Sequence, residues 1–149
     1  MRFGIIAIMV LALTGCGGKG KTVQYDYVDA SISQLQLGQS GVLEQTWNLT
    51  LRMQNPNNYD IPADGMKFLV RVNGKEFARG VDNQSVMIPR LGEAVIQVRA
   101  ISDLAAVMNQ INDMQSIGYQ GIDYRLTGTV YSGQWRYPFE HHGNIKPVP

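Results

Sequence analysis

The chain has 149 residues, with 13 lysines and arginines against 12 aspartates and glutamates, and a single cysteine. This near-neutral balance disfavours a nucleic-acid-binding protein, because such proteins carry a clear excess of basic side chains. One cysteine cannot form a disulfide within the chain, so the folded part must be stabilised by packing alone.

The first sixteen residues have the layout of a bacterial lipoprotein signal. Arg2 is followed by a short apolar run, which ends in Leu13-Thr14-Gly15-Cys16. The run is too short for a transmembrane helix, which needs about 20 apolar residues. Leu-Thr-Gly-Cys resembles the lipobox, whose cysteine becomes the lipid-bearing N-terminus after cleavage. We therefore predict a signal peptide over residues 1–15 and lipidation of Cys16; the alternative is an ordinary signal peptide with an incidental cysteine.

Cleavage before Cys16 would remove 15 of the 149 residues and leave 134, enough for one domain with a substantial core. Arg2 would be lost with the signal, so basic and acidic side chains would balance at 12 each. Residues 16–22 are then the lipidated N-terminus and a tether, and residues 23–149 the folded domain. Gly17, in place of an aspartate after the cysteine, favours the outer membrane, with the domain facing the periplasm.

The segment from Gly15 to Thr22 also matches the phosphate-binding loop pattern G-x-x-x-x-G-K-T letter for letter. A working loop of this kind needs a buried strand before it and a helix after it, whose N-terminal amides face the phosphates. Here a signal peptide precedes the motif, cleavage removes Gly15, and the alternating residues Val23 to Val28 predict a strand. We therefore expect no nucleotide binding.

Alternating apolar and polar residues predict several strands along the rest of the chain. They are residues 47–54, 66–72, 86–89, 94–99, 124–131 and 135–139. Asn55-Pro56-Asn57-Asn58 is expected to end the first of them, because proline has no amide to donate and asparagine tolerates turns. Pro138 confines the last to a sheet edge or a strand end.

Asn73-Gly74 predicts a hairpin after the strand at 66–72, because a type I′ turn needs positive φ at both positions. A two-residue loop would place Arg71 opposite Glu76 and Val70 opposite Phe77, both favourable cross-strand pairs.

One later segment has helical periodicity. Its apolar residues are Leu104, Val107, Met108, Ile111 and Met114. Ser102 is placed to cap the N-terminus, Asp103 favours the helix dipole, and Gly118 lies just beyond the end. We expect an amphipathic helix of about three turns whose apolar stripe covers an open end of the core; a partner-binding helix is the alternative. Many short strands with one helix predict a mainly β fold, an antiparallel β-sandwich.

Several motifs resemble type 2 late embryogenesis abundant (LEA type 2) domains, which are related to the water-stress and hypersensitive-response (WHy) domain. Asn55-Pro56-Asn57, followed by Tyr59 to Pro62, is similar to a signature of that family. Further similar pieces follow in the family's order over about residues 25–149. They are Val70 to Lys75, Ala78 to Gly80, Ile88-Pro89, Ile96 to Val98, Tyr124 to Val130 and Tyr137 to Phe139.

The resemblance implies a β-sandwich of fibronectin-III or immunoglobulin type. It also implies a link to desiccation, cold or osmotic stress through protection of proteins or membranes, and some relatives bind lipid in a groove. The motif residues Asn55, Pro56, Asn57, Asn73 and Gly74 would be structural, and none would be catalytic.

Other candidates for chemistry are weaker. His141-His142 with Glu140 offers three metal-ligand types, but adjacent strand residues point to opposite faces and no cysteine or second histidine cluster completes a site. We interpret them as a solvated turn. Asp26 with Asp29 and Asp60 with Asp64 lack the ligand density of a calcium loop. Ser85 and Ser116 lack a nucleophile elbow or a base, and Trp47 and Trp135 fit core or sheet-face positions.

We therefore expect a membrane-anchored, non-catalytic, stress-associated protective or binding module without a cofactor or metal. Its partners would be the membrane, through the N-terminal lipid, and protein clients or lipid, but neither nucleic acid nor nucleotide. The alternatives are an apolar-ligand or lipid-binding domain in envelope lipid handling, a structural component of an envelope complex and, more distantly, a hydrolase.

Overall fold

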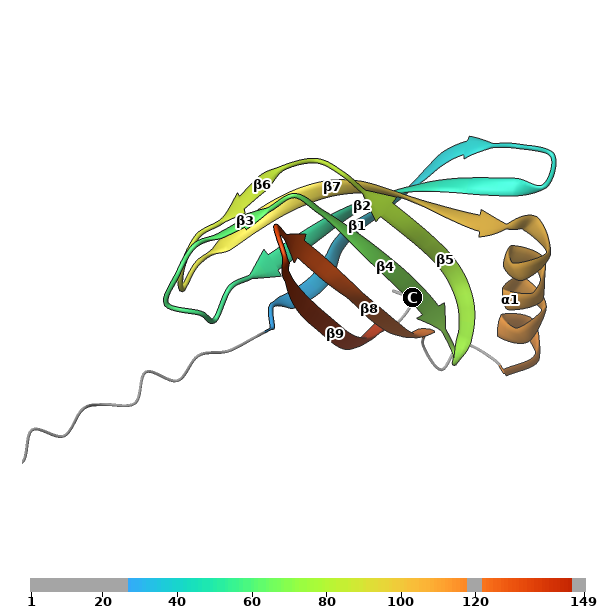
Figure 1. Ribbon diagram of the computed structural model, residues 1–149. Helices are drawn as coiled ribbons and strands as arrows, with labels where there is room; N and C mark the ends of the chain where they lie inside the picture. Colours follow the sequence, from blue (N-terminus) through green and yellow to red (C-terminus); the bar gives the residue numbers. More distant parts are fainter. Residues whose placement is uncertain (1–26, 118–121, 146–149) are drawn as a thin grey trace, which may run out of the picture.

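The computed structural model describes residues 27–117 and 122–145. These residues form strands and one helix, which confirms the mainly β fold class (Figure 1). The strands are β1 (Asp29–Ser40), β2 (Glu44–Gln54), β3 (Ile61–Ala63), β4 (Gly65–Val72), β5 (Lys75–Asp82), β6 (Val86–Ile88), β7 (Glu93–Asp103), β8 (Ile122–Ser132) and β9 (Trp135–Ile145). The helix α1 is Leu104–Ile117.

Seven strands form one antiparallel sheet in the order β1-β2-β7-β5-β4-β8-β9, and β3 pairs with β6 in a second, small sheet. The large sheet curls until its two edge strands, β1 and β9, approach each other. At this contact the amide of Val28, just before β1, donates to the Pro138 carbonyl in β9 at 3.2 Å. Pro138 is tolerated in β9 because β9 is an edge strand of the large sheet, where a residue can lack an amide donor on the outer side. The result is a half-barrel form of the sandwich.

The core fills the inside of the curl. In β2, Leu49, Leu51 and Met53 are buried and alternate with exposed or half-buried polar residues. The β3–β6 pair covers this core with Ile61 and Ile88, which are both fully buried. Burial of each such side chain contributes about 1.5–3 kcal/mol, so packing stabilises the fold without a disulfide.

Glycines opposite aromatic rings help the sheet to curl. A Cβ atom on any of these glycines would overlap the ring of its cross-strand partner, so the ring packs directly on the backbone. The pairs are Gly80 with Phe68, Gly128 with Phe139 and Gly143 with Tyr124.

The Asn73-Gly74 hairpin forms as predicted, with φ of 48° and 82° at the two residues. Arg71 faces Glu76, which confirms that pair, but the expected pairing of Val70 with Phe77 is wrong. A bulge between Val70 and Arg71 sets Val70 opposite Ala78 instead. The bulge frees Phe77 to pack against the Trp47 ring, at 5.1 Å between centroids.

The N-terminal strand differs from the expectation. The predicted strand at residues 23–28 lies mostly outside the described residues, and β1 begins only at Asp29. The alternation of apolar residues does not predict β1, because its register shifts between Ile32 and Gln34. That irregularity moves the apolar residues out of strict alternation and hides the strand period.

A buried pair of asparagines joins segments that are distant in the chain. The Asn55 amide nitrogen donates to the carbonyls of Tyr59 (2.8 Å) and Ile88 (3.1 Å). Its oxygen accepts from both the backbone and the side-chain nitrogen of Asn57, at 2.9 and 3.0 Å. The Asn57 side chain also donates to the Tyr27 carbonyl at 3.1 Å. β2 ends at Gln54, immediately before this network.

Replacing Asn55 with aspartate tests this network. Asn55→Asp keeps the shape but removes both donors, so two buried carbonyls would face a carboxylate. We expect a loss of about 3 kcal/mol in the free energy of unfolding, measured by urea denaturation at pH 7. Asn58→Asp, at an exposed neighbouring position, is the matched control and should change the free energy by less than about 0.5 kcal/mol. Equal losses in the two variants would contradict the role of the network.

Candidate functional site

The helix begins later than its sequence suggests. Ser102 does not cap it, because β7 continues through Asp103 opposite Glu44. The Ser102 side chain is buried, and its hydroxyl accepts from the Trp47 indole nitrogen at 2.8 Å. A tertiary hydrogen bond therefore replaces the expected cap, and the helix starts at Leu104.

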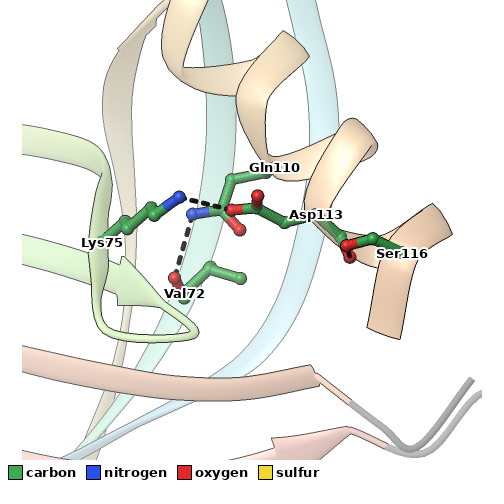
Figure 2. A network of polar contacts seen from close by, with 5 residues as sticks. All are labelled: Val72, Lys75, Gln110, Asp113 and Ser116. Carbon is green, nitrogen blue, oxygen red and sulfur yellow. Dashed lines mark hydrogen bonds and ion pairs between the residues drawn. The ribbon is translucent and has the colours of Figure 1, made fainter. Parts of the chain in front are cut away.

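Polar groups hold α1 against the sheet (Figure 2). Gln110 is only 2% exposed, and its side-chain nitrogen donates to the Val72 carbonyl at 2.9 Å. The Lys75 ammonium pairs with the Asp113 carboxylate at 2.7 Å. The expectation that the apolar stripe of the helix covers the core is therefore wrong, since the buried face is centred on Gln110.

Three residues of the apolar stripe of α1 face solvent and continue onto the β1–β2 hairpin, whereas Val107 is half-buried. Leu104, Met108 and Ile111 are 42%, 52% and 43% exposed. The Leu104 amide donates to the Leu43 carbonyl at 2.9 Å, which brings the hairpin to the start of the helix. At the hairpin, Val42 and Leu43 are 89% and 76% exposed. We call these five residues the apolar end; Figure 1 shows the hairpin and α1 at the end of the molecule away from the β3–β6 pair.

A hollow of about 1190 Å³ lies over the outer face of the large sheet. We call it the outer hollow. Its lining includes Lys67, Arg79 and Arg99, the carboxylates of Glu44 and Asp82, and a group of amides. The amides are Gln34, Gln36, Asn48, Gln84 and Gln97. The lipid-binding hypothesis predicts a continuous apolar groove, whereas charged and amide side chains interrupt the lining of this hollow.

The outer hollow lies where β5 and β7 diverge. These two strands share one registered pair, Arg79 with Ile101, whereas β4 and β5 pair along most of their length. Sequence reasoning did not single out the hollow, because its residues come from strands far apart in the chain. The sequence pattern that points to this surface is the set of outward-facing polar residues in each alternating strand, such as Gln97 and Arg99 in β7.

The histidines occupy a strand rather than the expected turn, because β9 extends to Ile145 opposite β8. His141 lies against the Tyr124 ring, 5.8 Å between centroids, and His142 contacts the Glu140 carboxylate at 2.7 Å. Burial raises the pKa of the Tyr124 hydroxyl above its ordinary value. In the part of the chain that the structure describes, no three His, Cys, Asp or Glu side chains gather to hold a metal ion.

The paired aspartates serve separate turns. Asp60 accepts from the Arg90 backbone amide at 2.8 Å, and Asp64 accepts from the Gly133 amide at 2.6 Å. Asp26, Cys16 and the Gly15 to Thr22 segment lie outside the described residues. Within those residues, no helix is long and apolar enough to span a membrane.

A family model described as Late embryogenesis abundant protein matches residues 50–143. The chain belongs to the late embryogenesis abundant protein family. The match spans both asparagine motifs and most of the outer hollow, and it confirms the resemblance found in the sequence. Membership associates the chain with stress proteins, in a family that is generally non-enzymatic. No curated protein sequence matches this chain.

Solved structures agree with the fold. A protein of Arabidopsis thaliana, solved in solution, is 18% identical with a TM-score of 0.59, over 79% of this chain and 80% of that chain. A protein of Archaeoglobus fulgidus is 13% identical with a TM-score of 0.50, over 80% of this chain and 99% of that chain. At these identities the similarity shows a shared fold and carries no assignment of ligand.

The docking of α1 gives a test by hydrogen exchange. Gln110→Ala removes the hydrogen bond that joins the helix to the Val72 carbonyl. We expect the amides of α1 to exchange about tenfold faster, while those of β2 and β8 keep their rates, because the helix opens locally. Gln115→Ala, at an exposed position of the same helix, is the control. Unchanged exchange in α1 would show that Gln110 does not hold the helix.

Proposed function

We propose that the chain is a lipid-anchored, non-catalytic, stress-associated protective module of the cell envelope. The observation that carries this proposal is the family match over residues 50–143, in a chain that begins with a lipobox ending in Cys16. The family supports the association with stress, and the resemblance of Leu13 to Cys16 to a lipobox supports the membrane location, for which Gly17 favours the outer membrane.

The surfaces of the domain fit such a role. The inside of the curled sheet is filled by side chains such as Leu51 and Leu126, so interactions with clients take place on the outside. There the domain presents a polar hollow on the sheet and an apolar end at the hairpin and helix. Proteins or membranes that lose water expose both polar and apolar groups. The outer hollow can contact the polar groups, and the apolar end can contact the apolar ones.

The anchor and the stress role are tested together in a deletion strain. Wild-type protein should appear in the membrane fraction with acyl mass on Cys16 and should restore survival after drying. Cys16→Ala removes the acylation site and should leave an unlipidated protein. Rescue of survival should then be impaired, because the acyl chains hold the protein at the bilayer. Gly18→Ala keeps the lipobox and should behave as wild type.

The two claims fail separately. An unmodified Cys16 in the membrane-bound protein would contradict the anchor. Survival of the deletion strain equal to wild type after drying and osmotic shock would contradict the stress role, even where lipidation is found.

A second candidate, a component of an envelope complex, is favoured by the apolar end. Exposed apolar patches commonly mark protein interfaces. A photocrosslinking residue at Val42 should then yield one discrete adduct in intact cells, whereas one at Asn58, also exposed, should yield none. Equal labelling at the two positions would count against a specific partner at this end.

A further inference from the structure

We infer that the outer hollow binds a saccharide that carries one anionic group, a phosphate or a carboxylate, held among Lys67, Arg79 and Arg99. This goes beyond the proposed function, which names no small-molecule ligand for the hollow.

The three cations lie close together on the outer face. Arg79 in β5 is opposite Leu69 in β4 and Ile101 in β7, and Lys67 is opposite Val81. Lys67 and Arg99 therefore each lie two residues along the strand from a direct neighbour of Arg79. Such diagonal positions are about 7–8 Å apart, so the long side chains can converge on one anion.

Among the described residues, these cations make only one ion pair, which is long and exposed. The Arg99 guanidinium has no ion pair or hydrogen bond with the residues that the structure describes. The Arg79 guanidinium lies 3.5 Å from the Glu76 carboxylate, and these two side chains are 70% and 52% exposed. The Lys67 ammonium lies 5.9 Å from the centre of the Tyr131 ring. By contrast, Arg52 on the same face is paired with Glu93 at 2.6 Å.

Rows of amides lead away from the cations. Gln36 faces Asn48, and Asn48 faces Arg99, which makes a continuous row across β1, β2 and β7. Gln34, Thr50 and Gln97 form a second, parallel row. Amide side chains offer both donors and acceptors, which is what the hydroxyl groups of a sugar require. Between the cations, Leu69, Val81 and Ile101 offer aliphatic surface for the C–H faces of a sugar ring.

The carboxylates limit the charge of the ligand. Asp82 and Glu44 both line the hollow, so a ligand with anionic groups along its whole length would be repelled. The volume of about 1190 Å³ is far more than a phosphate ion needs and slightly exceeds that of small-molecule pockets, which is about 300–1,000 Å³.

The experiment uses the full mature protein in detergent and three probes: glucose 6-phosphate, glucose and inorganic phosphate. Isothermal titration calorimetry and saturation-transfer NMR should detect glucose 6-phosphate, with glucose and phosphate each binding at least about tenfold more weakly. Arg99→Gln should weaken glucose 6-phosphate binding about tenfold or more, and Arg79→Gln should do the same.

Arg136→Gln is the matched control, because Arg136 is an exposed β9 cation outside the hollow, and it should leave the affinity unchanged. Thermal melting of each variant checks that it folds. No detectable glucose 6-phosphate binding would overturn the proposal, as would an equal loss in Arg136→Gln. Phosphate alone binding as tightly as the sugar phosphate would overturn the saccharide assignment. None of these outcomes depends on lipidation or on survival after drying, so this inference and the proposed function fail independently.

Discussion

The buried hydrogen bonds of Asn55 and Asn57 are the constraint on which the rest of the structure depends. All four hydrogen-bonding positions of the Asn55 side chain are used, on β6, on the loop before β3 and on Asn57. Asn57 then holds the Tyr27 carbonyl, and the next residue, Val28, donates to the Pro138 carbonyl. Because a low-dielectric interior makes an unpaired polar group costly, this chain of bonds sets where β1 starts and how the sheet closes.

Closure of the sheet has a consequence for function. A curled sheet with a filled interior presents only its outer face and its ends to other molecules. β5 and β7 share only one registered pair, and the outer hollow lies over this part of the sheet, beside Arg79 and Arg99. At the far end, Gln110 and Asp113 hold the helix by polar contacts and thereby leave its apolar stripe in solvent. The domain therefore separates a polar surface from an apolar one.

The regular strands and the Asn73-Gly74 turn were predictable because their residues alternate without interruption, and the motif from Asn55 to Pro62 indicated the family. The errors have local physical causes. Bulges displaced Phe77 and obscured β1, and the indole of Trp47 took the Ser102 hydroxyl from its expected capping role. The outer hollow could not be read from the sequence, since its amide rows join β1, β2 and β7 only after folding.

Native-state hydrogen exchange of the Asn55, Asn57 and Leu91 amides tests the central role of the asparagine network most directly. The three amides donate to Gly92, to the Asn55 side chain and to the Asn57 carbonyl, at 2.9, 2.9 and 3.0 Å. Although they lie in loops, they should exchange only through global unfolding, at the same free energy as the amides of β2 and β8. Exchange that is orders of magnitude faster, as in an ordinary surface loop, would contradict the account.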